Sequence, residues 1–127
     1  MDSRMMETVI KMTKLEELTN EIRVFCDERD WSKFHTPKDL AIGMVGEAAE
    51  LMEIFRYRDL AESLALIDEK REAVGDELAD VFFHLLRFAD LYAFDLSDEL
   101  RRKMVKNALK YPVAKVKGKN LKYDEYE

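Results

Sequence analysis

The most informative segments of this chain are Ile42-Gly-Met-Val-Gly-Glu-Ala-Ala-Glu-Leu-Met-Glu-Ile54 and Glu77-Leu-Ala-Asp-Val-Phe-Phe-His-Leu-Leu86. Each places two acids three residues apart within an otherwise largely apolar segment. On an α-helix, residues three apart lie on the same face, about one turn from each other. The sequence therefore predicts two helices that each project two carboxylates from one stripe. These carboxylates belong to Glu47 and Glu50 on the first helix and to Glu77 and Asp80 on the second.

The neighbours of these acids are expected to form the core. They are Ile42, Met44, Val45, Leu51 and Ile54, with Leu78, Val81, Phe82, Leu85 and Leu86. Carboxylates are almost never fully buried without a partner, and few cations lie near them in the sequence. Ligation by carboxylate oxygens suits hard cations, so we expect a divalent metal, Mg²⁺ first and Mn²⁺ next. Gly46 and Gly75 stand beside the acids, where glycine costs a helix about 1 kcal/mol relative to alanine. They predict that a backbone or a ligand approaches closely there.

Two alternatives to a metal-dependent enzyme are open at this point. An isolated Glu-x-x-Glu in a charge-rich helix usually lines a solvated face, and such a chain would be a non-catalytic helical oligomerisation or interaction module. Two acidic pairs in the two most apolar segments, each beside a glycine, favour the metal. A di-iron bundle needs Glu-x-x-His on its helices, and neither His35 nor His84 has a glutamate three residues before it.

Length and composition predict one all-α domain over residues 1–127. Four glycines and two prolines leave little for the many turns of a β protein. A net charge of −6 argues against binding to the nucleic-acid backbone and to anionic membranes. No stretch approaches the roughly 20 apolar residues of a membrane span. The lone Cys26, with an N-terminus that lacks an apolar signal region, predicts a cytoplasmic protein.

Helix signals divide the first half of the chain into two helices and a loop. Thr13 and Glu16 have the spacing of a capping box and predict a helix that starts there. Residues 29–36 break the apolar periodicity and predict a loop. Thr36 followed by Pro37 is an N-cap before a proline at the first helical position, so a second helix should run to about residue 56.

The second half predicts two more helices and a polar tail. After a connection at 57–63, a third helix should span about 65–93, and Ser97 should cap a fourth that ends near Lys110. Pro112 cannot continue that helix, so the core is expected over about 13–112 and a tail over 113–127. The third helix is apolar on nearly all of its faces. A monomer of this size cannot cover that much apolar surface. This predicts a homo-oligomer.

Weaker candidates each have a structural and a functional interpretation. His84 shares a helix face with Glu77 and Asp80, and either packs in the core or contacts a substrate. Trp31 and His35 lie in the loop before the second helix, where aromatic rings either close the core or stack on a base. The cations of the fourth helix, Lys103 and Lys110 among them, either hold phosphates or form a solvated face near a helix C-terminus. Asn107 is less easily explained as a structural residue, because asparagine is a poor helix former and lies here in mid-helix.

Combined motifs in the sequence resemble a known family. Glu47-x-x-Glu50 followed after 26 residues by Glu77-x-x-Asp80 resembles the metal motif of the all-α nucleoside triphosphate pyrophosphohydrolases, the MazG-like superfamily. Further matches look like its dCTP pyrophosphatase branch. They are Arg29-Asp30-Trp31-x-x-Phe34-His35-x-Pro37-x-x-Leu40, Val45-Gly46-Glu47-x-x-Glu50-Leu51 and Asn107-x-x-x-Tyr111-Pro112. The resemblance covers about residues 15–112.

The resemblance implies a four-helix-bundle-type fold and a homo-oligomer, a dimer or a tetramer. It implies Mg²⁺-dependent cleavage of a (deoxy)nucleoside triphosphate, such as dCTP or a modified pyrimidine nucleotide, to the monophosphate and pyrophosphate. By position, Glu47, Glu50, Glu77 and Asp80 would hold Mg²⁺. Trp31 and His35 would border the base, and Lys103, Asn107, Lys110 and Tyr111 would contact phosphates. Tyr57 replaces the tryptophan usual in this branch, and His84 a frequent tyrosine, so a preference for cytosine does not follow.

Overall fold

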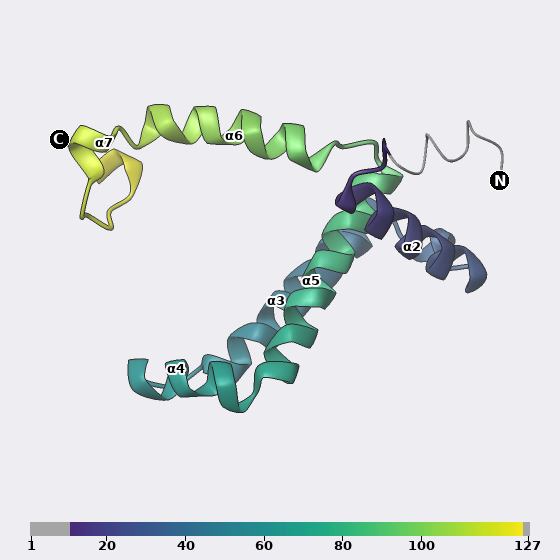
Figure 1. Ribbon diagram of the computed structural model, residues 1–127, viewed down its shortest axis with the longest axis horizontal. Coiled ribbons are helices and arrows are strands. Elements are labelled where there is room, and N and C mark those ends of the chain that lie inside the picture. Colours follow the sequence, from purple (N-terminus) through teal and green to yellow (C-terminus); the bar gives the residue numbers. More distant parts are fainter. Residues whose placement is uncertain (1–10, 126–127) are drawn as a thin grey trace. The chain divides into compact units, whose positions relative to one another are not determined.

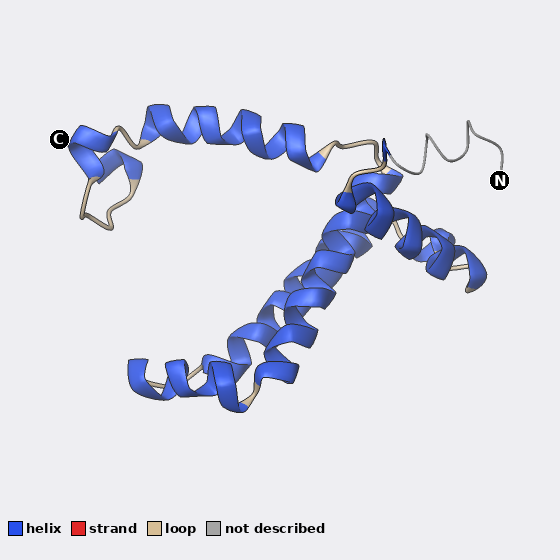
Figure 2. Ribbon diagram, viewed as in Figure 1, coloured by secondary structure: helices blue, strands red, loops and turns tan. Residues whose placement is uncertain are grey.

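The chain is described by a computed structural model over residues 11–125, and every regular element in that range is helical (Figure 2). The all-α prediction is therefore confirmed for this part of the chain. The elements in chain order are α2 (Lys14–Glu28), η1 (Ser32–Phe34), α3 (Pro37–Phe55), α4 (Leu60–Glu69), α5 (Arg71–Leu91), α6 (Leu96–Lys110), α7 (Val113–Val116) and η2 (Tyr123–Glu125).

The described part of the chain divides into two compact units, which meet between residues 93 and 94. In the first unit, α3 and α5 pack side by side along most of their lengths (Figure 1). Helix α2 packs on α5, and α4 contacts both α5 and α3. The second unit carries α6, α7 and η2. The long pairing of α3 with α5 brings the two acidic stretches of the sequence together.

The start signals of the first two helices are confirmed. The Thr13 hydroxyl accepts a hydrogen bond from the Glu16 backbone N–H at 3.2 Å, and the Glu16 carboxylate accepts one from the Thr13 N–H at 3.3 Å, which completes the capping box. The Thr36 hydroxyl accepts from the Asp39 N–H at 3.1 Å, with Pro37 at the first helical position. Both caps satisfy backbone donors that a helix start leaves without partners.

The single helix predicted over 65–93 is wrong. An earlier N-cap, Asp59, accepts from the Glu62 N–H at 2.8 Å and starts α4 at Leu60. The backbone then leaves the helical region at Lys70, with φ −119° and ψ 37°, before α5 begins. Leu66 and Val74, on either side of this break, are both buried. The break thus serves tertiary packing, and neither glycine nor proline marks it in the sequence.

The cap predicted for the fourth helix is also wrong. The Asp95 side chain accepts from the Asp98 N–H at 3.0 Å and starts α6, so Ser97 lies inside its first turn. The predicted end at Lys110 is confirmed. The predicted polar tail contains the short helix α7 and the turn η2, and the Lys110 ammonium lies 4.9 Å from the centre of the Tyr123 ring.

The buried core of the described residues is small. It consists of Cys26, Leu40, Leu66, Val74, Leu86 and Ala89, with one buried charged residue, Arg87. Several residues predicted as core are exposed in this single chain: Ile42 by 58%, Val45 by 70% and Leu78 by 53%. The seam between α3 and α5 therefore buries only part of their apolar surface. No helix in the described range has both the length and the apolarity needed to cross a bilayer.

Candidate metal site

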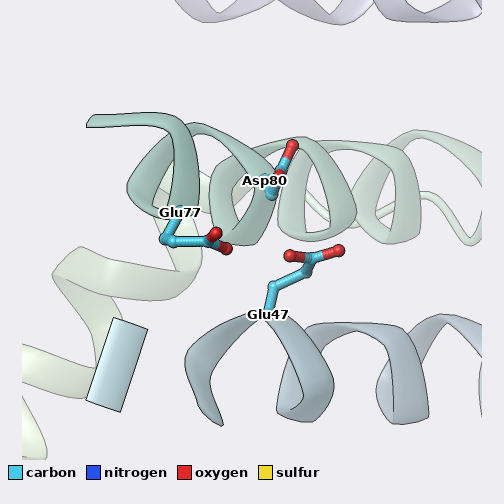
Figure 3. Close-up of side chains that lie close together, drawn as sticks. All are labelled: Glu47, Glu77 and Asp80. Atoms are coloured by element: carbon cyan, nitrogen blue, oxygen red, sulfur yellow. The ribbon is translucent and has the colours of Figure 1, made fainter. Parts of the chain in front are cut away.

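Three acids from two helices converge in the seam between α3 and α5. Glu47 reaches from α3 toward Glu77, and Asp80 follows one turn further along α5 (Figure 3). One carboxylate oxygen from each of the three lies within 4.8 Å of the other two. Glu50 is exposed, as Asp80 is, but lies outside this set of three. Its carboxyl nevertheless acts on Glu47 and Glu77 through charge and hydrogen bonding.

The electrostatics of the cluster disfavour full ionisation of its carboxyls. A hydrogen bond with the Glu50 carboxyl, followed by desolvation and repulsion from Glu50 and Glu47, raises the pKa of Glu77 to about 7. The pKa of Glu47 is also raised, first by desolvation and then by the charges of Glu50 and Asp80. Within the described range, neither lysine nor arginine forms an ion pair with any of the four acids.

Two oxygen atoms of the cluster fit a metal directly. Glu47 Oε2 and Glu77 Oε2 are buried and have no hydrogen-bond partner within the described part of the chain. A buried acceptor without a partner costs about 1–3 kcal/mol, and more when it is charged. A divalent cation would satisfy both oxygens and neutralise the mutual repulsion. The donor set contains only oxygen, which suits Mg²⁺ or Mn²⁺ better than zinc or copper.

A glycine that sequence analysis did not single out allows the close approach of α3 and α5. A Cβ atom on Gly43 would lie 2.5 Å from Nε2 of His84, so the imidazole occupies the space of a side chain. The His84 Nδ1–H donates to the Asp80 backbone carbonyl at 2.8 Å. Gly46 and Gly75, for which the approach of a backbone or a ligand was predicted, have no other part of this chain within 4 Å of an added Cβ. The prediction is therefore wrong for a backbone of the same chain. Gly43 lies one turn before Glu47, a spacing that could have identified it.

The loop before α3 contains a series of aromatic rings. Trp31 packs edge-on against Phe25 and His35, with ring centroids 5.5 and 6.3 Å apart. Phe83 makes similar edge contacts with Phe25 and with His84. These contacts connect the loop that carries Trp31 to the helix that carries Glu77 and Asp80. The structure thus brings Trp31, His35 and His84 into the same unit as the acids.

Two residues that no sequence motif marked hold this loop. The guanidinium of Arg87, which is only 1% exposed, donates from Nε to His35 Nδ1 at 3.0 Å and from an Nη to Ser32 Oγ at 2.9 Å. The Tyr92 hydroxyl donates to the His35 backbone carbonyl at 2.6 Å. The two side-chain partners of Arg87 lie more than 50 residues away from it in the sequence, so no local pattern marks the contact.

The remaining predicted site residues lie just after α3 or in the second unit. Tyr57 follows α3 with a positive φ of 65°, and its ring is 88% exposed with the Arg56 guanidinium 4.7 Å from the ring centre. The other four belong to the second unit, where their spacing places them along one face of α6 and its C-terminal cap. They are Lys103, Asn107, Lys110 and Tyr111.

Comparisons with known proteins agree with this geometry. A family model described as the MazG-like family matches residues 43–126. dCTP pyrophosphatase 1 of Rattus norvegicus is 35% identical over 113 residues, and that of Homo sapiens is 33% identical over 113 residues. Each alignment covers 87% of this chain and 66% of the relative. The chain thus spans just under two thirds of the length of these relatives.

A solved structure shares the fold. A pyrophosphatase from Archaeoglobus fulgidus superposes with a TM-score of 0.76 at 39% identity, covering 80% of this chain and 94% of that one. The helical fold, the paired acidic stretches and these similarities together define the class. The chain belongs to the MazG-like family, as the resemblance predicted.

Proposed function

We propose that the chain hydrolyses a nucleoside triphosphate to the monophosphate and pyrophosphate with a divalent metal at the α3–α5 seam. The observation that carries the proposal is the pair of buried, unpartnered oxygens on Glu47 and Glu77, which face a cluster with no cation of its own among the described residues. The similar proteins named dCTP pyrophosphatase 1 and pyrophosphatase support the reaction type.

The acids of the cluster would have two roles, binding of the metal and orientation of the attacking water. Glu47, Glu50, Glu77 and Asp80 would hold Mg²⁺, which Mn²⁺ could replace. When bound, such a metal neutralises charge on phosphoryl oxygens and helps to supply an activated water. One of the glutamates would also orient the attacking water. Water adds to phosphorus, the anhydride bond between the α and β phosphates breaks, and pyrophosphate leaves.

Residues outside the acidic cluster would bind the base and the phosphates of the nucleotide. Trp31 and His35 lie in a loop connected by ring contacts to α5, which suits a flat base. Tyr57 and His84 would complete the base site, and Lys103, Asn107, Lys110 and Tyr111 would contact phosphates. The names of the relatives favour dCTP or a modified pyrimidine nucleotide. A role in cleansing the nucleotide pool would follow, in the cytoplasm where that pool lies.

The test is a panel of canonical and modified triphosphates assayed for pyrophosphate with Mg²⁺ or Mn²⁺. Glu50→Gln and Asp80→Asn should each lower turnover at least about a hundredfold, because each removes a charge from the metal site. Matched controls lie on the same helices: Glu53→Gln on α3 and Asp76→Asn on α5 should keep near-normal turnover. Both control residues are exposed acids outside the cluster.

Two results would contradict the proposal. Full activity in both Glu50→Gln and Asp80→Asn would reject the site. No pyrophosphate from any triphosphate, together with no effect of Mg²⁺ or Mn²⁺ on the melting temperature, would favour the non-catalytic interaction module. Metal binding should raise the melting temperature because the metal binds the native arrangement.

A further inference from the structure

The only buried charged residue in the described range lies outside the acidic cluster. Arg87 is on α5, two turns beyond Asp80, and its side chain is 1% exposed. Burying a guanidinium is costly, and an apolar residue of similar volume often serves stability as well or better. The partners of Arg87 therefore indicate what the residue does.

The shortest bonds of Arg87 go to neutral groups of the loop before α3, not to a carboxylate. Its two hydrogen bonds reach His35 Nδ1 at 3.0 Å and Ser32 Oγ at 2.9 Å. The nearest carboxylate, on Asp90, lies 3.9 Å away and is already bound by Arg23 at 2.6 and 3.0 Å. Arg87 thus joins α5 to the loop that carries Trp31 and His35.

The contact with His35 fixes where its proton lies. An arginine Nε–H can only donate, so Nδ1 of His35 must accept and carries no proton. A neutral imidazole with a bare Nδ1 has its proton on Nε2. The Tyr92 hydroxyl holds the backbone of the same residue through its carbonyl, at 2.6 Å. Desolvation, then the charges of Arg87 and His84, lower the pKa of His35 and keep the ring neutral.

We propose that Arg87 is a positioning residue that fixes the His35 ring as the neutral Nε2–H tautomer, so that this ring offers a hydrogen-bond donor to an acceptor on the nucleobase. This rests on the proposed function for the identity of the ligand. A carbonyl oxygen or an unprotonated ring nitrogen of the base is the complementary group. Arg87 acts through His35 and does not itself touch the nucleotide.

The first experiment needs no activity. The chain has two histidines, and long-range ¹H–¹⁵N spectra of imidazoles distinguish the two tautomers. At pH 8 the His35 signal, assigned by its loss in His35→Gln, should show a protonated Nε2 and a bare Nδ1. His84 should show the opposite pattern, because its Nδ1–H donates to the Asp80 carbonyl. If wild-type His35 instead carries its proton on Nδ1 or shows mixed tautomers, that result by itself overturns the proposal.

Variants test whether the hydrogen bond from Arg87 to His35, and not the neighbouring bonds, fixes the His35 tautomer. Arg87→Lys keeps a charge but loses the fixed geometry of the guanidinium, so the His35 tautomers should mix. Ser32→Ala removes the other bond of Arg87, and Tyr92→Phe removes the backbone anchor. Both leave the Nε–H donor in place and should keep the Nε2–H tautomer. Mixed tautomers in these two variants, with a fixed tautomer in Arg87→Lys, would reject Arg87 as the cause.

The second experiment measures kinetics on the best triphosphate. Arg87→Lys should raise KM about tenfold, the effect of one lost hydrogen bond to the base, with kcat within about twofold. A merely structural role would lower the active fraction, and hence kcat, at unchanged KM. Unchanged KM alongside a lost tautomer would overturn the donor role of His35. An inactive wild type with the expected spectra would count against the proposed function while leaving the positioning by Arg87 intact.

Discussion

Gly43 and His84 show how one missing side chain sets the distance between two helices. The imidazole of His84 lies where a Cβ of residue 43 would be, at 2.5 Å. The same ring donates to the backbone carbonyl of Asp80. The spacing of α3 and α5, and with it the distance between Glu47 and Asp80, therefore depends on a glycine at position 43.

Gly43→Ala should destabilise the chain by about 1–3 kcal/mol, the usual cost of inserting a methyl group into a packed seam. Chemical unfolding followed by circular dichroism measures this. Gly46→Ala on the same helix is the matched control. Its new Cβ meets nothing within 4 Å in the chain, so alanine should be neutral or stabilise by up to about 1 kcal/mol.

A second variant assigns the cause of that destabilisation. In a His84→Ala background the ring is absent, so Gly43→Ala should cost little or nothing more. Equal costs of Gly43→Ala in the two backgrounds would show that something other than the His84 ring limits the space at position 43.

The pairing of α3 with α5 brings acids of both helices close together. The raised pKa values of Glu47 and Glu77 mean that the folded chain holds protons more tightly than the unfolded chain. Stability must then fall as the pH rises from the ordinary value of 4.5 toward about 7, where Glu77 loses its proton. The two helices repel each other most above this window.

In metal-free buffer, the melting temperature should therefore decline between pH 5 and pH 8, and Mg²⁺ should restore more of it at pH 8 than at pH 5. Glu77→Gln should flatten the decline. His35 acts in the opposite direction, because its lowered pKa makes the unfolded chain the better proton acceptor below about 6.5. The difference in pH profile between wild type and Glu77→Gln separates the contribution of the acids from that of His35. An identical pH profile in both would contradict the assignment.

The start of α6 depends on one side chain. Asp95 accepts from the Asp98 N–H, and loss of an N-cap typically costs about 1 kcal/mol. Asp95→Ala should lower stability by about that amount, seen as lost helicity or earlier thermal unfolding. Ser97→Ala should have little effect, because Ser97 lies within the helix. If Ser97→Ala instead lowers stability more than Asp95→Ala does, Ser97 is the cap.

The first unit as a whole exposes apolar side chains on both of its long helices, α3 and α5. Ile42, Val45 and Met52 on α3, with Leu78, Phe82 and Leu85 on α5, are all exposed in the single chain. Soluble monomers rarely expose contiguous apolar patches of more than a few hundred Å². A second copy of the chain is the economical cover, so we propose a homo-oligomer, either a dimer or a tetramer.

Sedimentation or light scattering should give a mass two or four times that of the chain. Val45→Asp should lower it, because a charge buried in an apolar interface costs several kcal/mol unless it is paired. Lys14→Glu, at an exposed position on α2, is the control and should leave the mass unchanged. A monomeric wild type would contradict the proposal.

Local signals in the sequence determined much of the architecture. Thr13 with Glu16 and Thr36 with Pro37 placed two helix starts, because capping involves only residues within one turn of each other. The three-residue spacing of the acids placed each pair on one helix face for the same reason. The all-α class followed from composition and periodicity, and the family followed from motifs that combine these local features.

Features that depend on residues far apart in the sequence follow from the packing of the folded chain. The break at Lys70 follows from packing on α3 and α5, and the seam depends on Gly43 facing His84, 41 residues later. Arg87 finds its partners in a loop more than 50 residues earlier. Capping and helix periodicity act over a few residues. Burial and interhelical contact depend on which distant segment is opposite, and local patterns do not encode that.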